Sequence, residues 1–473
     1  MKESVKKLTG RRSFLTGAAA TVGAGFWAND TLDAALQYTN TASKPSELRI
    51  TDVRMAGAII RVDTNQGIVG YGENRDGAIP SYVLELKRLV VGENPCSVDQ
   101  IFRKIKQFGH HARQGGGVSG MEVALWDLAG KAYNVPIHQM LGGKFRDRVR
   151  IYCDTPGAAD PALFKQRFDL RVKDGFTFFK ADVGVSLIQN VPGTLVYPAG
   201  ADISGRTVHM FTGLEITDKG IALMADYMAK VREAAGWQVP IATDHFGHIG
   251  VNSCIRLGKA FEKFNLAWME DFIPWNYTEL WKKITDAIET PTLTGEDIYL
   301  KEGFVELAKN HAVDMLQPDL LTSGGILETH KLGDAIQEYG VPMVLHNASG
   351  PVGFFANVHC AAATENFLAL EHHAVDRPEW GDVVSNIKPI LDKGYVNVPN
   401  GPGLGITLNE DAIRKSLQNG PGYFEPTPQW DLQQMNPGRG GPAAPGRGTP
   451  ATPGRGTPAT PGRGRAPNDR LWS

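Results

Sequence analysis

Short apolar runs alternate with longer amphipathic stretches between residues 150 and 375. The stretches between the runs, such as DKGIALMADYMAKVREAAG and GGILETHKLGDAIQEYG, have the apolar spacing of helices. Eight runs can be counted: RIYCDT, FTFFKADV, PIATDHF, LAWMEDF, PTLTGED, DMLQPDL, PMVLHNA and FLALEHH. Eight strand–helix units in succession predict an α/β fold, a TIM-type (β/α) barrel.

Ionisable side chains close most of these runs. The carboxyl ends of barrel strands all face one mouth, where barrel enzymes carry out their chemistry. The spacing is regular, since Asp244, Glu270 and Glu296 follow at intervals of 26 residues, and Asp319, His346 and Glu371 at intervals of 27 and 25. Each interval is one strand–helix unit, so equivalent positions on successive strands are expected. The candidate site residues are Lys180, Asp182, Asp244, Glu270, Glu296, Asp319, His346 and Glu371.

The segment before the barrel has a different pattern. It begins ELRITDVRMAGAIIRVDTNQGIVGYGENRD, which is alternating and rich in turns and predicts a small antiparallel sheet. Helical stretches follow, and Ser119 and Glu122 have the spacing of a capping box. We therefore expect an α+β capping domain over residues 45–148 and the barrel over 149–410, with 411–430 a candidate for packing back on the capping domain.

The candidate residues suggest a metal site and a base. Three crowded carboxylates, Asp244, Glu270 and Glu296, would repel one another, and a divalent cation removes that cost. Oxygen ligands without thiols favour Mg²⁺, with Mn²⁺ next. Asp319 would accept one imidazole N–H of His346 and raise the basicity of the other nitrogen, as in a general base.

Two further roles follow from the same positions. Glu371 would hydrogen-bond a substrate oxygen, and Lys180 would offer a cation to a substrate carboxylate. The expected partner is therefore a small-molecule carboxylate.

These motifs together resemble the mandelate racemase and muconate lactonizing enzyme family of the enolase superfamily. The matching pieces are SGMEVALWDLAGKA, LGGKFRDRVRIY, the Asp-Glu-Glu series, QPDLLTSGGI, LHNASGP and LALEHH. The resemblance implies Mg²⁺-assisted removal of a proton α to a carboxylate through an enediolate. It matches Asp244, Glu270 and Glu296 to the metal ligands, Asp319 and His346 to the basic dyad, and Glu371 to the acid on the last strand.

Departures from the family pattern favour elimination of water. Racemases of this family usually carry Lys-x-Lys on the second strand, whereas this chain has Lys180-Ala181-Asp182. Some acid-sugar dehydratases carry a histidine two residues after the first metal ligand, where this chain has Phe246. His245 and His248 flank that position, and either of them, or Asp182, is the candidate acid.

The leading hypothesis is therefore a Mg²⁺-dependent acid-sugar dehydratase, a lyase. A racemase or epimerase of a hydroxy acid is the alternative, and a non-catalytic carbohydrate-acid-binding protein is a third. Thirty extra residues after the second strand run are expected over the mouth, with Tyr197, Arg206 and His209 as polar candidates. A homo-oligomer is expected.

The two ends of the chain differ from the middle. Arg11-Arg12 before a short weakly apolar stretch resembles a twin-arginine export signal, so residues 1–40 are expected to be a leader and the protein periplasmic. The alternative is a chance Arg pair. PGRG begins at 437, 445, 453 and 461, and this density of Pro and Gly predicts a disordered tail over 436–473.

Composition excludes several other classes. The net charge of the 473 residues is −2, so no basic field indicates nucleic acid. The four cysteines lie far apart without a CxxC, which argues against a zinc cage or disulfide framework. No run of 18 apolar residues occurs, and no membrane span is expected.

Overall fold

The computed structural model describes residues 43–75, 77–111, 117–158, 160–203, 207–244, 246, 248–417 and 422–428. The predicted leader, the predicted tail, His245 and Arg206 lie outside the described residues. No helix within these ranges is long and apolar enough to cross a membrane. All four cysteines are free.

The N-terminal domain is an antiparallel sheet, in the order β1-β2-β3, covered by helices. Helix α4 packs closely on β3 because glycines line the contact. A Cβ on Gly72 would lie 2.0 Å from the Gly120 carbonyl oxygen. The elements are η1 (Pro45–Glu47), β1 (Ile50–Ala56), β2 (Ile59–Thr64), β3 (Val69–Glu73), α2 (Pro80–Val90), α3 (Val98–Ile105), η2 (Lys106–His111), α4 (Val118–Tyr133) and α5 (Ile137–Met140).

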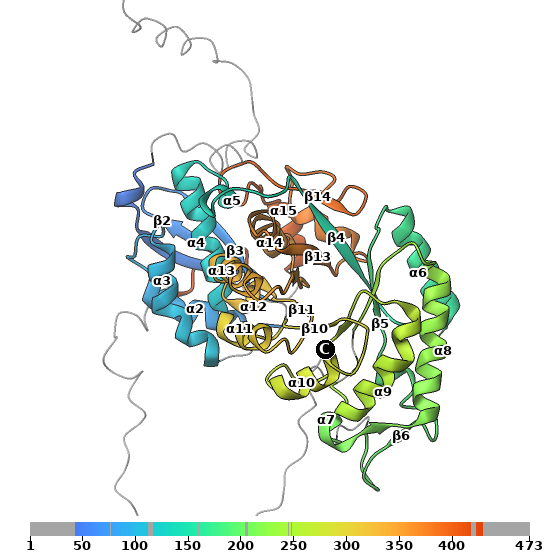
Figure 1. Ribbon diagram of the computed structural model, residues 1–473. Helices are drawn as coiled ribbons and strands as arrows, with labels where there is room; N and C mark the ends of the chain where they lie inside the picture. The colour runs from blue at the N-terminus through green and yellow to red at the C-terminus, as the bar shows by residue number, and fades with distance from the viewer. Residues whose placement is uncertain are drawn as a thin grey trace, which may run out of the picture.

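Eight parallel strands then close into a barrel, which lies beside the N-terminal domain (Figure 1). Strand β13 pairs with β4 and completes the ring. Each of the eight predicted runs contains one of the strands, so the predicted fold is confirmed. The barrel strands are β4 (Arg148–Thr155), β5 (Phe179–Asp182), β8 (Ile241–Asp244), β9 (Met269–Glu270), β10 (Thr292–Thr294), β11 (Met315–Leu316), β12 (Met343–Leu345) and β13 (Phe367–His372).

Helices follow the first seven strands and cover the outside of the barrel. Strand β14 (Tyr395–Asn397) pairs antiparallel with the first three residues of β4, Arg148 to Arg150. The remaining elements are α6 (Pro161–Lys173), α8 (Asp218–Ala235), α9 (Val251–Phe261), η5 (Glu262–Phe264), α10 (Thr278–Thr285), α11 (Lys301–Lys309), α12 (Leu320–Ser323), α13 (Ile326–Gln337), α14 (Pro351–Ala363), η6 (Pro378–Val383) and α15 (Glu410–Ser416).

The interior of the barrel is filled by one side chain from each strand. Tyr152 and Phe178 contact the Trp268 indole there, with ring centroids 5.3 and 5.0 Å away. Side chains alternate across a strand, so residues two positions later also point inward, at the mouth. The interior residues are Tyr152, Phe178, Ala242, Trp268, Leu293, Met315, Val344 and Ala369.

The insertion after β5 packs against loops at the carboxyl ends of the strands. It contains η4 (Val185–Leu187), α7 (Met210–Gly213) and the two-stranded ribbon β6 (Leu195–Val196) and β7 (Glu215–Ile216). Phe211 contacts the Tyr277 ring before α10, and Glu215 bonds the Ser253 hydroxyl on α9. The insertion therefore borders the mouth.

Ser119 and Glu122 do not form the predicted capping box. Helix α4 starts after Gly117 without a side-chain cap. The Glu122 carboxylate instead accepts hydrogen bonds from the backbone N–H groups of Ile326 (2.7 Å) and Leu327 (3.0 Å) at the start of α13. Ser119 bonds the Thr322 carbonyl oxygen. The polar side chains of α4 are used to dock the barrel, because the barrel helix presents unpaired N–H groups to them.

Glu73 makes a similar contact at the end of β3. Its carboxylate accepts from the N–H groups of Gly350 (2.6 Å) and Gly353 (2.8 Å) at the start of α14. Near the other end of the chain, the Phe424 ring contacts Tyr71, and its carbonyl oxygen accepts from Arg54. Residues around Phe424 thus lie against the small sheet.

Burial raises the pKa of Glu122 to about 8, and its two backbone hydrogen bonds only partly oppose this. The folded chain holds a proton that the unfolded chain loses above pH 4.5, so stability should fall as pH rises from about 5 to 8. We expect Glu122→Gln to abolish this fall, measured by urea denaturation at several pH values. Glu93→Gln, which changes an exposed pair with Lys104, should keep it. Equal pH dependence in both variants would contradict the assignment.

Candidate active site

Strand alternation places most of the candidate residues at the mouth. Five of them lie two positions beyond an interior side chain, and all five are buried. They therefore converge on one volume at the carboxyl ends of the strands. These residues are Lys180, Asp244, Glu270, His346 and Glu371.

Glu296 and Asp319 do not hold the equivalent positions that their spacing suggested. Glu296 lies three residues beyond Leu293, because Gly295 adopts a φ of +147° and takes the inward position. Asp319 lies four residues beyond Met315 and caps α12, accepting from the Leu321 N–H at 2.8 Å. Turns after β10 and β11 thus aim both carboxylates at the mouth.

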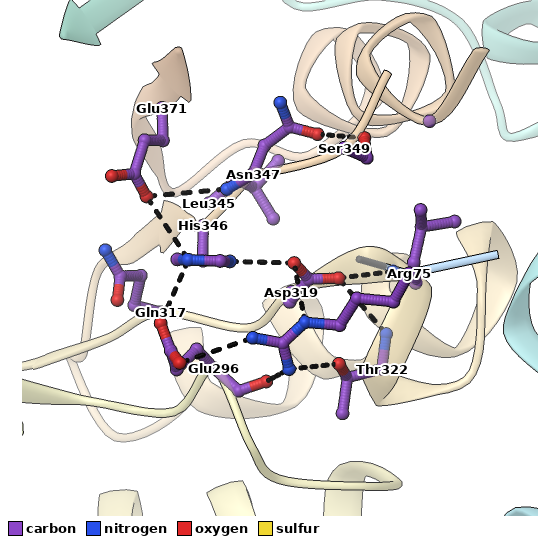
Figure 2. A network of polar contacts seen from close by, with 12 residues as sticks. Arg75, Glu296, Gln317, Asp319, Thr322, Leu345, His346, Asn347, Ser349 and Glu371 are labelled. Carbon is purple, nitrogen blue, oxygen red and sulfur yellow. Dashed lines mark hydrogen bonds and ion pairs between the residues drawn. The ribbon is translucent and has the colours of Figure 1, made fainter. Parts of the chain in front are cut away.

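Asp319 and His346 form the predicted dyad (Figure 2). Asp319 Oδ2 lies 2.7 Å from His346 Nδ1, while Nε2 lies 2.9 Å from Glu296 Oε2 and 3.7 Å from Glu371 Oε2. Burial of the imidazole opposes its protonation, but Glu296, Glu371 and Asp319 outweigh burial and hold the pKa of His346 well above its ordinary value. Both ring nitrogens therefore face carboxylates, an arrangement that favours the doubly protonated imidazolium.

Arg75 links the N-terminal domain to the dyad, and sequence reasoning missed it. Its guanidinium lies 3.2 Å from Glu296 Oε1 and 3.6 Å from Asp319 Oδ2, and it donates to Thr322 Oγ1 at 2.7 Å (Figure 2). The side chain is 3% exposed and also bonds Asp297. Arg75 is 221 residues from Glu296 along the chain, so no local pattern indicates this contact.

Lys180 is the cation on the opposite side of the mouth. Its ammonium lies 2.7 Å from Glu371 Oε1, 2.9 Å from Asp244 Oδ2 and 3.2 Å from Glu270 Oε1. Burial opposes the charge on Lys180, but these three carboxylates raise its pKa well above the ordinary value. Burial raises the pKa of Glu371, but the charges of Lys180 and His346 outweigh burial and hold this pKa below its ordinary value.

The carboxylates proposed as metal ligands come from adjacent strands and suit a hard divalent cation. Burial and then Asp244 raise the pKa of Glu270 well above its usual range, which is the repulsion that a cation would relieve. Within the described ranges, however, no three His, Cys, Asp or Glu side chains are already arranged around a metal position. The chain's own cations hold these groups, with Lys180 on Asp244 and Glu270, and Arg75 and His346 on Glu296.

The candidate acids lie beside these carboxylates. Asp182 is the register neighbour of Asp244 across β5 and β8. His248 follows the end of β8 at Asp244 by four residues and has a φ of +53°, a left-handed backbone conformation. Burial lowers the pKa of His248, although Asp297, Asp244 and Glu296 favour its charged form. The structure thus brings His248 and Asp182 to the mouth, and it does not describe His245.

The insertion candidates have other contacts. The His209 ring accepts from the Thr212 N–H and so caps α7. Tyr197 is exposed at the tip of β6. His372, beyond Glu371, packs against Phe354 and Trp380.

Three polar side chains that the sequence analysis left out support the carboxylates. Gln317 Nε2 donates to Glu270 Oε2 at 3.2 Å and to the Tyr152 hydroxyl at 2.6 Å. Tyr152 donates in turn to Glu371 Oε2, and the Trp268 indole to Glu270 Oε2. Gln317 directly follows β11 and lies two residues before Asp319, so a polar residue at the end of the strand was the available signal.

Both domains match family models. Residues 32–142 match the mandelate racemase / muconate lactonizing enzyme N-terminal domain, and residues 164–412 match the enolase C-terminal domain-like model. The chain belongs to the mandelate racemase / muconate lactonizing enzyme family of the enolase superfamily. The resemblance inferred from its motifs is confirmed.

The names of similar proteins indicate the class of enzyme within this family. D-xylonate dehydratase of Haloferax volcanii is 32% identical over 407 residues, covering 82% of this chain and 94% of that protein. D-gluconate dehydratase of Thermoproteus tenax is 27% identical over 377 residues, covering 77% and 71%. A mandelate racemase/muconate lactonizing enzyme-like protein of Rubrobacter xylanophilus has a TM-score of 0.68 at 30% identity, covering 80% and 98%. The chain is accordingly an enzyme of the dehydratase-like group.

Proposed function

We propose that the protein removes water from an acid sugar, giving a 2-keto-3-deoxy acid. The observation that carries this is the Asp319–His346 dyad, whose Nε2 faces Glu296 and Glu371 in a barrel mouth lined by carboxylates. The named relatives act on D-xylonate and D-gluconate. This group of acids is therefore the expected substrate class.

The proposed metal is Mg²⁺, with Mn²⁺ as the alternative, held by Asp244, Glu270 and Glu296. When bound, it supplies positive charge that stabilises the negative charge developing on the substrate carboxylate, a known pattern of this superfamily. For this, Lys180 must leave Asp244 and Glu270, and Glu296 must turn from His346. Losing Glu296 removes the largest of the three carboxylate contributions that raise the pKa of His346, and so moves the imidazole toward the neutral form that a base requires.

His346 is then the base. Its Nε2 takes the proton from the carbon next to the substrate carboxylate, while Asp319 holds Nδ1–H and stabilises the resulting imidazolium. The bond between the next carbon and its hydroxyl breaks, and that hydroxyl takes a proton and leaves as water. The enol that remains takes up a proton on the carbon that lost the hydroxyl, releases its O–H proton and becomes the keto acid.

His248 is the acid that we propose for the departing hydroxyl, since it follows the end of β8 and the charges of Asp297, Asp244 and Glu296 favour its protonated form. We expect His248→Asn to lower kcat about 10²- to 10⁴-fold while exchange of the α-proton with D₂O, followed by NMR, stays within a few-fold of the wild type. His209→Asn, which changes only a cap of α7, is the matched control. An unchanged kcat would transfer the role to His245 or Asp182.

The proposed function is tested with a panel of aldonic and aldaric acids that includes D-xylonate and D-gluconate. Purified protein with Mg²⁺ should form a 2-keto acid from at least one of them, and EDTA should stop the reaction. No turnover of any acid, with Mg²⁺ binding shown by calorimetry, would refute the proposal. Deuterium entering unreacted substrate without elimination would instead favour the racemase or epimerase alternative.

We also propose that the protein is exported through the twin-arginine route and forms a homo-oligomer. Arg11 and Arg12 support export. Two exposed apolar side chains on the same face of α6, Leu163 and Leu170, support self-association. Cell fractionation should find the wild type in the periplasm and an Arg11→Lys/Arg12→Lys variant in the cytoplasm. Sedimentation should give a mass that is a multiple of the protomer mass.

A further inference from the structure

Asp154, at the end of β4, is a carboxylate of the mouth to which neither the motifs nor the dyad chemistry gives a role. It lies two residues beyond Tyr152, which points into the barrel, and its register neighbour on β5 is Lys180. Strand alternation therefore turns the Asp154 side chain inward, in the same mouth as the other carboxylates.

The Asp154 carboxylate is buried and only half paired. Its side chain is 3% exposed, and Oδ2 lies 3.4 Å from Nε2 of His373, a half-exposed residue directly after β13. Oδ1 has no hydrogen-bond partner among the described residues. The neighbouring ammonium of Lys180 bonds Asp244, Glu270 and Glu371. A buried acceptor without a donor is costly, so a donor group of a ligand would be strongly favoured here.

The position of β4 in the ring indicates which part of a ligand would reach Asp154. The strands close in the order β4-β5-β8-β9-β10-β11-β12-β13, so β4 stands opposite β10, four strands away in either direction, and three strands from β11. The proposed metal ligands lie on and after β8, β9 and β10, and the dyad lies after β11 and β12. A substrate whose carboxylate and reacting carbons are held between these groups extends the rest of its chain toward β4.

We propose that Asp154, with His373 beside it, forms a subsite that accepts a hydrogen bond from a substrate hydroxyl beyond the two reacting carbons. This inference rests on the proposed function and specifies its substrate class: a polyhydroxylated acid, not a simple hydroxy acid. Asp154 then acts in binding and in selection between sugar acids, and the base and the acid of the reaction lie elsewhere.

The competing explanation is structural. The pair of Asp154 and His373 joins the ends of β4 and β13. In this explanation the loss of the pair would disturb the barrel, and its effect would not depend on any particular substrate hydroxyl. The two explanations differ in whether the effect of a substitution depends on a particular substrate hydroxyl, which a double-mutant cycle between protein and substrate measures.

The experiment uses the full chain with Mg²⁺ and D-xylonate with its 4-deoxy and 5-deoxy forms, or D-gluconate with its 4-, 5- and 6-deoxy forms if that acid is turned over. In the wild type, loss of the bound hydroxyl should lower kcat/KM about 10- to 100-fold, as expected for a hydrogen bond to a charged group. In Asp154→Asn, KM for the complete acid should rise by a similar factor, and removal of that hydroxyl should cost less than about 3-fold.

Two variants serve as controls. Asp376→Asn breaks the ion pair with Arg171, whose guanidinium also donates to the backbone carbonyl oxygen of Asp154, and it leaves the Asp154 carboxylate unchanged. This variant should therefore keep the wild-type discrimination. His373→Asn, which leaves the Asp154 carboxylate in place, should keep most of the wild-type discrimination between the complete and the deoxygenated acid. If Asp154→Asn fails to fold, Asp154→Glu, which moves the carboxylate by one methylene, should lose the discrimination instead.

The outcomes separate the two proposals. If no sugar acid is turned over by the wild type, the proposed function and this inference both fall. If the wild type is active but deoxygenation costs the same in the wild type and in the folded Asp154 variant, only the hydroxyl-binding subsite is refuted. Equal losses in Asp154→Asn and His373→Asn for every substrate would also refute it and establish the structural role.

Discussion

Replacing His346 with asparagine is expected to lower kcat for dehydration by about 10³- to 10⁴-fold. The imidazole is the group that the structure holds for proton transfer, with Nδ1 2.7 Å from Asp319 and Nε2 turned to Glu296 and Glu371. An amide fills part of the ring's space but cannot take up a proton. Exchange of the α-proton with D₂O should be lost together with elimination, which distinguishes this variant from His248→Asn.

Mg²⁺ affinity should remain within a few-fold of the wild type in His346→Asn, measured by calorimetry, because the proposed ligands are unchanged. His330→Asn is the matched control, since His330 lies on α13 and contacts Thr364, away from the mouth. Activity above about a tenth of the wild-type value would show that His346 is not the base.

Replacing Arg75 with methionine is expected to lower both stability and turnover. The guanidinium is buried between Glu296, Asp297 and Asp319, and its loss leaves His346 as the cation beside Glu296 and Asp319. Removal of one partner of a buried ion pair costs about 3–5 kcal/mol of unfolding free energy. Asp319 also loses a contact that fixes it against His346. Because a small misplacement of the base lowers the rate strongly, kcat should fall about 10²-fold.

Urea denaturation and steady-state kinetics measure these two effects. Arg61→Met is the matched control, because Arg61 pairs with Asp63 on the same small sheet but is one-third exposed. Its change in unfolding free energy should be about 1 kcal/mol or less, with kcat unaffected. The unfolding free energy and kcat of Arg75→Lys should lie between those of the wild type and Arg75→Met, since one ammonium cannot replace the several donors of the guanidinium. If Arg75→Met behaves like Arg61→Met, the bridge from the N-terminal domain has no role in the site.

Much of the site followed from one regularity, the ionisable residue that ends each apolar run. This regularity depends on backbone geometry, since a parallel barrel brings the carboxyl ends of all strands to one mouth. It gave Asp244, Glu270, His346 and Glu371 their positions. It also applied to Asp154, the last ionisable residue of the run RIYCDT, which was not among the candidates. Gln317 is polar but not ionisable, so the regularity did not include it.

Turn geometry limited the same reasoning at Glu296 and His248. The spacing of 26 residues placed Glu296 level with Glu270, whereas Gly295 takes that inward position and Glu296 follows it. The φ of +53° at His248 is likewise a property of the turn, and the spacing of apolar residues does not predict it. Local backbone angles after a strand depend on the loop that follows, and a pattern of apolar residues does not encode them.

The sequence by itself determined the barrel and its mouth, because both follow from the period of side chains along a strand and from the order of the strands. It also identified the two residues of the dyad, although the turn after β11 decides how Asp319 reaches His346. Only the tertiary structure decided that Glu73, Arg75 and Glu122 of the N-terminal domain reach the barrel. Those contacts join residues more than 200 positions apart. Their partners are backbone N–H groups and buried carboxylates that become available only when the two domains pack together, so nothing in the surrounding sequence could identify them.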